Sequence, residues 1–248
     1  MNRGLIMSYK VLLTASGTGS RLGTLTQSMN KSLLSLGGRP VISHIIDMYP
    51  TDTEFVITLG YLGDQVKDFL DHAYEDRFFQ YVFVDPYQGK GSSLGYSMLQ
   101  ARSFLEEPFV FHACDTLVVE PILPPEEDWI AGRVIRSGEA FDQYRTHIVK
   151  DGQILALQDK GVSPADSIHI GLVGIYSYAV FWKTLEHLYH IHSEDISLSD
   201  ASLLGDMLRA GVFFKWVPYR IWLDTGNPEA LQKTQAYFDA PQSASSFL

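Results

Sequence analysis

The stretch that decides the fold runs VLLTASGTGSRLG, from Val11 to Gly23. It begins within an apolar run over Lys10–Ser16, which predicts a strand, and it ends in a segment rich in glycine. Glycine lets backbone N–H groups come close to an anion, so the turn after the strand is a candidate phosphate-binding loop. A dinucleotide fingerprint would need glycine in place of Leu22, and no Gly-Lys-Ser/Thr follows as it does in a Walker A loop.

Two cations accompany this loop. Arg21 lies within it and Lys31 follows ten residues later. A planar guanidinium suits two-pronged contact with phosphate oxygens, whereas a lysine supplies a mobile point charge. The surrounding residues 1–46 contain no Asp or Glu but five cations, namely Arg3, Lys10, Arg21, Lys31 and Arg39. We therefore expect a small polyanion to bind at this segment.

Short apolar runs alternate with amphipathic stretches in the first half of the chain. Strands are expected over Lys10–Ser16, Glu54–Gly60, Phe79–Val84 and Phe109–Cys114, and helices over Val41–Met48, Gly63–Tyr74 and Ser92–Phe104. This alternation predicts an α/β fold with a Rossmann-like, three-layer and mostly parallel sheet.

Shorter runs separated by turn residues follow the proline-rich segment 120–125. Strands are expected over Ile130–Ile135, Thr146–Val149, Ile154–Leu157, Ile168–Tyr178 and Phe213–Val217, and helices over Ala179–His190, Asp200–Ala210 and from Pro228 to about Phe238. These predict a mixed, partly antiparallel extension of the same sheet. The chain is expected to be a single domain over residues 1–248, with a frayed tail at 241–248.

Two aspartates follow predicted strands. Asp115 comes after the apolar run Phe109–Cys114, and Asp224 ends the run Tyr219–Leu223. Ligands of open parallel sheets lie at the carboxyl ends of the strands, so both carboxylates are expected at the edge that carries the glycine loop. Two converging carboxylates suit Mg²⁺, which takes its remaining ligands from phosphate and water. Asp224 also has a purely structural interpretation, because Asn227 and Pro228 are typical helix-start residues.

The pattern Gly-x-Gly-x-Arg-Leu, a lysine about ten residues later and then Gly-x-Pro resembles the signature of sugar-phosphate nucleotidyltransferases. Here it covers residues 15–40, and the Asp-Thr-Gly-Asn-Pro-Glu segment from Asp224 resembles the family's later metal-binding segment. The resemblance implies that Arg21 grips a triphosphate, that Lys31 stabilises charge at the α-phosphorus, and that Asp115 and Asp224 hold Mg²⁺. The loop residues implied to bind the nucleotide are Ala15, Ser16, Gly17, Thr18, Gly19 and Ser20.

The resemblance also extends to a base-reading loop and to an acceptor site. Gln88, Gly91 and Ser92 fall in the first, although Ser92-Ser93 replaces the usual Thr-Ala pair. Lys160 falls in a segment similar to the family's Glu-Lys-Pro element and is implied to hold the acceptor phosphate, although a lysine in a surface turn is the alternative. Gly174 falls in a strand similar to one that borders the sugar.

The resemblance implies a nucleotide-binding core at residues 1–125, and an acceptor-binding part with closing helices at 126–240. The expected partners are a nucleoside triphosphate and a small phosphorylated acceptor, and the expected reaction joins the triphosphate to a sugar 1-phosphate and releases pyrophosphate. Two alternatives stay open. One is a cytidylyltransferase for a non-sugar phosphate resembling phosphocholine, and the other is a module that senses nucleotides without turnover.

Composition excludes several other classes. A net charge of −10 argues against general binding to nucleic acid or to an anionic membrane. Cys114 is the only cysteine, which excludes a disulfide within the chain and a four-cysteine zinc site. No apolar run approaches the roughly 20 residues of a membrane span, so a cytoplasmic location is expected. Three aromatic residues would permit contact between subunits of a homo-oligomer: Phe213, Phe214 and Trp216.

Overall fold

A computed structural model describes residues 9–240 of the chain. Arg3, from the cation-rich segment, and the tail expected to fray at 241–248 both lie outside the described residues.

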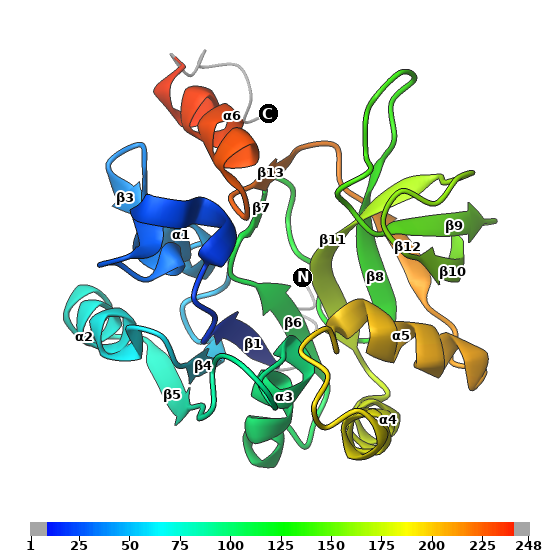
Figure 1. The fold of residues 1–248 in the computed structure, drawn as a ribbon, viewed down its shortest axis with the longest axis horizontal. Coiled ribbons are helices and arrows are strands. Elements are labelled where there is room, and N and C mark those ends of the chain that lie inside the picture. Colours follow the sequence, from blue (N-terminus) through cyan, green and yellow to red (C-terminus); the bar gives the residue numbers. More distant parts are fainter. Residues whose placement is uncertain (1–8, 241–248) are drawn as a thin grey trace, which may run out of the picture.

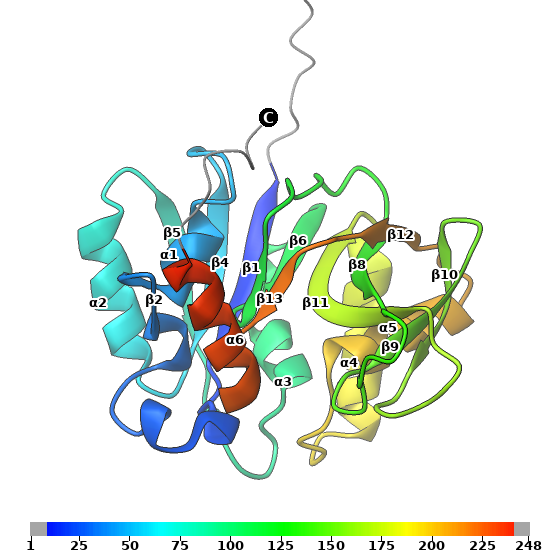
Figure 2. The ribbon, with the colours of Figure 1, turned by 90° about the horizontal axis from the view of Figure 1, so that it is seen from above.

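A nine-stranded sheet forms the centre of the fold, in the order β5-β4-β1-β6-β11-β8-β12-β10-β9. Its first four strands are mutually parallel and lie side by side in Figures 1 and 2: β1 (Lys10–Ala15), β4 (Glu54–Leu59), β5 (Phe78–Phe83) and β6 (Phe109–Ala113). They coincide within one residue with the four runs expected from the sequence. Since β1 lies between β4 and β6, the carboxyl ends of these strands meet at one edge of the sheet.

The second half of the sheet is mixed, as expected. Its strands are β8 (Trp129–Val134), β9 (Thr146–Lys150), β10 (Gln153–Gln158), β11 (Ser167–Ile175) and β12 (Lys215–Pro218). β11 runs antiparallel to both β6 and β8, whereas β12 runs parallel to β8. β9 pairs with β11 as well as with β10, so this half of the sheet curls back on itself.

Helices cover both faces of the sheet (Figure 2), which confirms the three-layer α/β fold. One face carries α1 (Val41–Ile46), α2 (Gly63–Ala73) and α6 (Pro228–Asp239). The other face carries α3 (Leu94–Gln100), α4 (Tyr178–Ile191) and α5 (Asp200–Arg209). Each layer buries its own apolar cluster against the sheet, which is the main stabilisation of such a fold. Three short 3₁₀ helices are η1 (Ser20–Thr26), η2 (Lys31–Leu33) and η3 (Arg102–Phe104).

Three of the four remaining short strands, β2 (Ser35–Leu36), β3 (Arg39–Pro40) and β7 (Thr116–Val118), were not expected from the sequence, and the fourth, β13 (Trp222–Asp224), overlaps the end of the run expected over Tyr219–Leu223. β2 pairs with β3, and β7 pairs antiparallel with β13. The expectation that Tyr219–Leu223 is a strand ending at the main sheet's edge is therefore wrong. Asp224 instead reaches that edge through the separate β7–β13 ribbon, in which it lies opposite Thr116.

Other differences have local causes. The helix expected over Ser92–Phe104 begins only at Leu94, because the hydroxyl of Ser93 accepts a hydrogen bond from the N–H of Tyr96 and caps it. Of the three aromatics expected at the surface, only Phe213 is exposed; Phe214 is fully buried and Trp216 is half-buried. Among residues 9–240, no helix has the length and apolar character that a membrane crossing requires.

Candidate active site

The glycine loop leaves the carboxyl end of β1 beside the end of β6. The parallel ladder pairs Thr14 with Ala113, so the residues that follow these two strands are neighbours. Gly17 is exposed, and a Cβ at this position would meet nothing within 4 Å. Gly19 has φ of +66°, and a Cβ there would lie 2.9 Å from Thr26 Cγ2. Position 19 therefore needs glycine, because its φ is positive and a side chain there would collide with Thr26. At Gly17 the missing side chain leaves open space beside the backbone.

Asn30, which the sequence did not single out, fixes the start of η2. Its buried side-chain amide donates to the carbonyl oxygens of Ala15 (3.0 Å) and Tyr61 (2.7 Å), at the ends of β1 and β4. Its Oδ1 accepts from the N–H of Ser32 at 3.0 Å. A fully satisfied buried amide of this kind holds the next residue, Lys31, in a defined position at the strand ends.

Lys31 and Asp115 form the centre of the site. Lys31 Nζ lies 2.9 Å from Asp115 Oδ2, and both side chains are about four-fifths buried. Burial alone would raise the pKa of Asp115, but the ammonium of Lys31 outweighs it and the pKa is lowered. Burial would likewise lower the pKa of Lys31, and the charge of Asp115 reverses this shift and raises it. Both groups are therefore ionised at neutral pH.

Arg21 lies at the open side of this pair. Its Nη2 is 4.0 Å from Asp115 Oδ2, and its side chain is 60% exposed. Such a loose contact leaves most of the guanidinium free to bind an anion.

Asp224 is brought to the same place from the far end of the chain. Its Oδ1 accepts from the N–H of Gly226 at 2.7 Å, and its Oδ2 accepts from the hydroxyl of Tyr144 at 2.9 Å. The pKa of Asp224 is raised, first by burial and then by the negative charge of Asp115. The backbone N–H of Thr225 donates to the carbonyl of Asp115 at 3.0 Å, which ties the two segments together.

Gly226 marks the point where these groups converge. A Cβ there would lie 3.0 Å from Asp224 Oδ1, 3.2 Å from Arg21 Nη2 and 3.2 Å from Asp115 Oδ2. Two carboxylates and a guanidinium thus lie around one position, where a side chain would force at least one of them to shift. The Asp-Thr-Gly segment in the sequence could have pointed to Gly226. No feature of the sequence pointed to Tyr144.

The residues present fit a magnesium ion. Among residues 9–240 no group of three or more His, Cys, Asp and Glu side chains could form a metal cage. Mg²⁺ does not require one, since one or two carboxylates with phosphate oxygens and waters suffice. The charge of Asp115 raises the pKa of Asp224, and a divalent cation between the two would relieve that repulsion.

The loop expected to read the base follows β5 at the same edge. Gln88 is exposed, and Gly91 has φ of +84°. The buried hydroxyl of Ser92 donates to the carbonyl of Gly89 at 2.6 Å and so closes the loop on itself. Lys90 pairs with Glu194 at 2.7 Å, which links this loop to the segment between α4 and α5.

The two residues expected on the acceptor side have different positions. Lys160 is exposed in the turn after β10, and its pKa is lowered by partial burial and by the charges of Arg21 and Arg145, so it belongs to the same cationic region. Gly174 lies inside the sheet between Val110 and Trp129, and the Trp129 indole fills the space of its missing side chain. Gly174 is therefore a packing residue, and the expectation that it borders the acceptor is wrong.

Gly171 is the β11 glycine that lies near the site. It has φ of +71°, and a Cβ there would lie 2.8 Å from the Cβ of Ala113 and 3.9 Å from Thr116 Oγ1. The strand register between β11 and β6, which the sequence does not reveal, decides which glycine faces this edge.

Comparisons with known proteins agree with this architecture. A low-salt glycan biosynthesis nucleotidyltransferase of Haloferax volcanii is 26% identical over 89% of this chain and 63% of its own length. Among solved structures, a Bacillus anthracis protein assigned as a glucose-1-phosphate thymidylyltransferase has a TM-score of 0.78 at 20% identity, covering 95% of this chain and 97% of that one. CTP:phosphocholine cytidylyltransferase of Streptococcus pneumoniae has a TM-score of 0.76 at 16% identity, covering 93% and 99%.

The names of further relatives differ in the base they imply, since they include cytidylyl-, thymidylyl- and guanylyltransferases. The chain spans less than two thirds of the length of the first curated relatives that it matches. No family model matches the chain.

Proposed function

Because the chain is a relative of the sugar-phosphate nucleotidyltransferases, we propose that it joins a nucleoside triphosphate to a sugar 1-phosphate, giving a nucleotide-sugar and pyrophosphate. In this reaction an oxygen of the acceptor phosphate attacks the α-phosphorus, and the bond from the α-phosphorus to the bridging oxygen breaks. The bonding electrons leave with pyrophosphate, so no covalent enzyme intermediate is needed.

The protein's part is positioning and charge stabilisation, as in other phosphoryl-type transfers. Arg21 and the loop amides of residues 15–20 would hold the β- and γ-phosphates. Lys31, already charged and held by Asn30, would move its contact from Asp115 to the α-phosphate as negative charge develops there. Lys160 would hold the acceptor phosphate.

Asp115 and Asp224 would hold Mg²⁺, which supplies neutralisation of the phosphate oxygens when bound. The hydrogen bonds from Tyr144 and Gly226 keep the Asp224 carboxylate aimed at Asp115. The lack of a side chain at Gly226 lets Asp224, Asp115 and Arg21 lie close to one another.

One observation carries the proposal: Arg21, Asp115 and Asp224 meet at Gly226, and Lys31 contacts Asp115 from the other side. A binding module without turnover has little need for two carboxylates beside the phosphate-binding cations. The measurement that tests it is pyrophosphate release from four triphosphates against a panel of sugar 1-phosphates and non-sugar phosphates, with Mg²⁺ and with EDTA. Metal-dependent release for one pair supports the proposal and identifies both substrates. Nucleotide binding without release from any pair would support the sensing module instead.

A non-sugar acceptor is the second candidate, and the fold likeness to a phosphocholine cytidylyltransferase supports including it. Phosphocholine with CTP therefore belongs in the panel. Release with that pair and with no sugar 1-phosphate would replace the first candidate by the second.

A further inference from the structure

Arg145 lies beside the proposed acceptor site but was not expected to bind a ligand. β9 begins at Thr146, which pairs with Gln158 at the end of β10. Arg145 is therefore opposite Asp159 and adjacent to Lys160. While Tyr144 contacts Asp224, Arg145 faces a cavity of about 390 Å³ between α4, α5 and β10.

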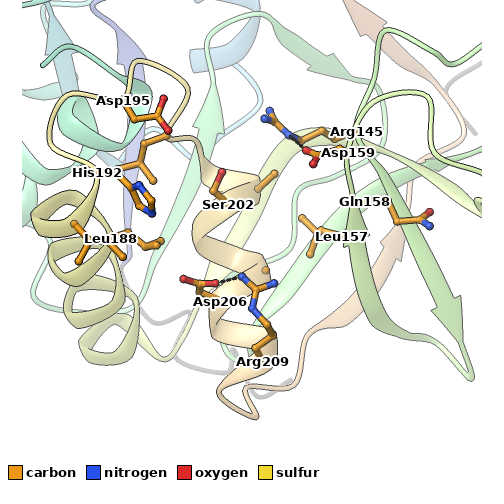
Figure 3. A pocket seen from close by; sticks show the side chains of 14 residues that line it. Arg145, Leu157, Gln158, Asp159, Leu188, His192, Asp195, Ser202, Asp206 and Arg209 are labelled. Carbon is orange, nitrogen blue, oxygen red and sulfur yellow. Dashed lines mark hydrogen bonds and ion pairs between the residues drawn. The ribbon is translucent and has the colours of Figure 1, made fainter. Parts of the chain in front are cut away.

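The guanidinium of Arg145 makes little direct contact with carboxylates, although its charge also helps to lower the pKa of the buried Asp200 on α5. The ion pair it makes within residues 9–240 is a single contact of 3.5 Å from its Nε to Asp159 Oδ1. The Asp159 side chain is 88% exposed, and a surface pair of this kind contributes little. Figure 3 shows Arg145 and Asp159 facing each other at one end of the cavity, while Asp206 and Arg209 pair at the other end. The guanidinium therefore keeps its two terminal nitrogens available for an anion.

Arg145 is one of several cationic side chains whose charges act on one another. Arg21 and Arg145 both act on Lys160 and lower its pKa, after the effect of burial. Cations placed together repel one another unless an anion lies between them. A phosphate dianion is the ligand that such a group suits, because a guanidinium can bind two of its oxygens at once.

The backbone that presents Arg145 is held firmly. Its carbonyl accepts a hydrogen bond from the N–H of His169 at 2.9 Å. The imidazole of His169 bonds to Asp200 on α5 at 2.7 Å and to His147 on β9 at 3.0 Å. This buried chain joins β9, β11 and α5, so the start of β9 is pre-organised for binding.

We propose that Arg145 is a second phosphate-binding residue of the acceptor site, acting with Lys160 to grip the acceptor's phosphate. This inference rests on the proposed nucleotidyl transfer. It makes Arg145 a determinant of acceptor affinity and not of nucleotide affinity.

The test compares Arg145→Gln, Arg145→Lys and Asp159→Asn in steady-state kinetics with the substrate pair found by the pyrophosphate-release screen. Arg145→Gln is expected to raise the KM for the acceptor about tenfold or more, with the KM for the triphosphate changed less than twofold. Arg145→Lys should recover part of the loss, since it keeps the charge without the planar fork. Arg102→Gln, which removes a surface arginine paired with Glu186, is the matched control and should leave both constants unchanged.

Asp159→Asn separates direct binding from a structural role. If Arg145 binds the acceptor, losing its carboxylate partner should leave the acceptor KM unchanged or lower it. An equal rise in Asp159→Asn and Arg145→Gln, or no rise in Arg145→Gln, would overturn the proposal.

A wild-type enzyme without turnover would refute the proposed function, and a binding measurement then decides on Arg145. Broadening of the ³¹P resonance of inorganic phosphate by the wild type, lost in Arg145→Gln and kept in Arg102→Gln, would retain the phosphate site. No broadening by the wild type, or equal broadening by Arg145→Gln, would reject it.

Discussion

The proposed nucleotide side and the proposed acceptor side of the site are assembled in different ways. On the proposed nucleotide side, the glycine loop, Arg21 and Lys31 come from one stretch of about twenty residues that follows β1. On the proposed acceptor side, Tyr144 and Arg145 precede β9 and Lys160 follows β10, and the antiparallel pairing of these two strands brings them together. The first side is contiguous in the sequence, whereas the second depends on strand pairing and on the contact from Tyr144 to Asp224, 80 residues away.

This difference suggests that the two sides affect different kinetic constants. A contiguous loop closed by Asn30 would present the same phosphate-binding groups whatever the acceptor is. Side chains that come from two separate segments beside β9 and β10 can change one at a time without disturbing that loop. We therefore expect variants on the nucleotide side to affect the chemical step, and variants on the acceptor side to affect mainly affinity or alignment.

Lys31→Met should give the largest effect. It removes the cation that lies 2.9 Å from Asp115 and that would stabilise the developing charge. Loss of such a group lowers kcat about 10²- to 10³-fold, with a smaller change in KM. Lys10→Met is the matched control, since Lys10 pairs with Glu107 at the opposite end of β1 and should leave kcat unchanged. A rise in KM with kcat unchanged would contradict the catalytic role of Lys31 and weaken the contrast between the two sides.

The pH dependence of the free energy of unfolding tests two buried histidines, His112 on β6 and His147 on β9. Burial lowers the pKa of His112 to about 4 and holds the pKa of His147 well below its usual value. Above pH 6.5 both rings are neutral in the folded and unfolded protein, so their contribution is complete there. As the pH falls from 6.5 towards 4, only the unfolded chain takes up these protons, and stability is lost.

For His112 the loss is on the order of 3 kcal/mol, from about 1.4 kcal/mol per pKa unit. Urea unfolding between pH 7 and 4 measures it in the wild type, in His112→Gln and in His147→Gln. Each variant should show a shallower decline than the wild type, whatever its stability at pH 7. An unchanged slope in either variant would mean that its histidine is protonated in the folded state.

Gly226→Ala tests the point where the two sides meet. A methyl group there would lie 3.0 to 3.2 Å from Asp224, Arg21 and Asp115, so at least one of them must shift. The shift needed is a few tenths of an ångström. Since misplacement of reacting groups by about 1 Å can cost roughly a hundredfold in rate, a loss of roughly ten- to a hundredfold in kcat/KM is expected. Gly205→Ala on α5 is the control, because the nearest atom to its added Cβ is Arg209 Nη1 at 3.5 Å. It should keep full activity and gain up to about 1 kcal/mol in stability. Wild-type activity in Gly226→Ala would show that the reaction does not depend on the present positions of these three groups.

Sequence alone was enough for the parts whose signals are local. The parallel strands, the three-layer fold and the position of Asp115 at the edge that carries the glycine loop follow from runs and loops that adjoin each other in the chain or in a regular βαβ order. Asp224 was expected at the correct edge, but at the end of a strand of the main sheet. The strand that precedes it, β13, instead pairs with β7 in a separate two-stranded ribbon, and an apolar run does not show which strand it will pair with.

Register could not be predicted. Gly171 and Gly174 are three residues apart on β11, and only the pairing of that strand with β6 and β8 decides that Gly171 lies near Thr116 while Gly174 packs on Trp129. A slip of one residue exchanges the faces of a strand, and nothing in the local sequence fixes it here. Tyr144 was missed for the same reason, because its partner is 80 residues away.

Tyr144→Phe should have the smallest effect of these variants, and it tests whether the acceptor side also serves the metal carboxylate. The change removes one hydroxyl that donates to Asp224 Oδ2 and keeps the ring that packs edge-on against Trp222. A hydrogen bond to a charged group contributes about 1.5 to 3 kcal/mol when its loss leaves the partner buried; since the N–H of Gly226 still holds Asp224, we expect the lower end, roughly a tenfold loss of kcat. The Mg²⁺ concentration for half-maximal activity should also rise, because the Asp224 carboxylate is then held less firmly in position near Asp115.

Tyr81→Phe is a close control, since the Tyr81 hydroxyl donates to Asp71 at 2.8 Å on the surface beside α2. If the two variants lose activity equally, or if Tyr144→Phe leaves the Mg²⁺ requirement unchanged, Tyr144 does not position Asp224 for catalysis, and the acceptor side contributes affinity alone.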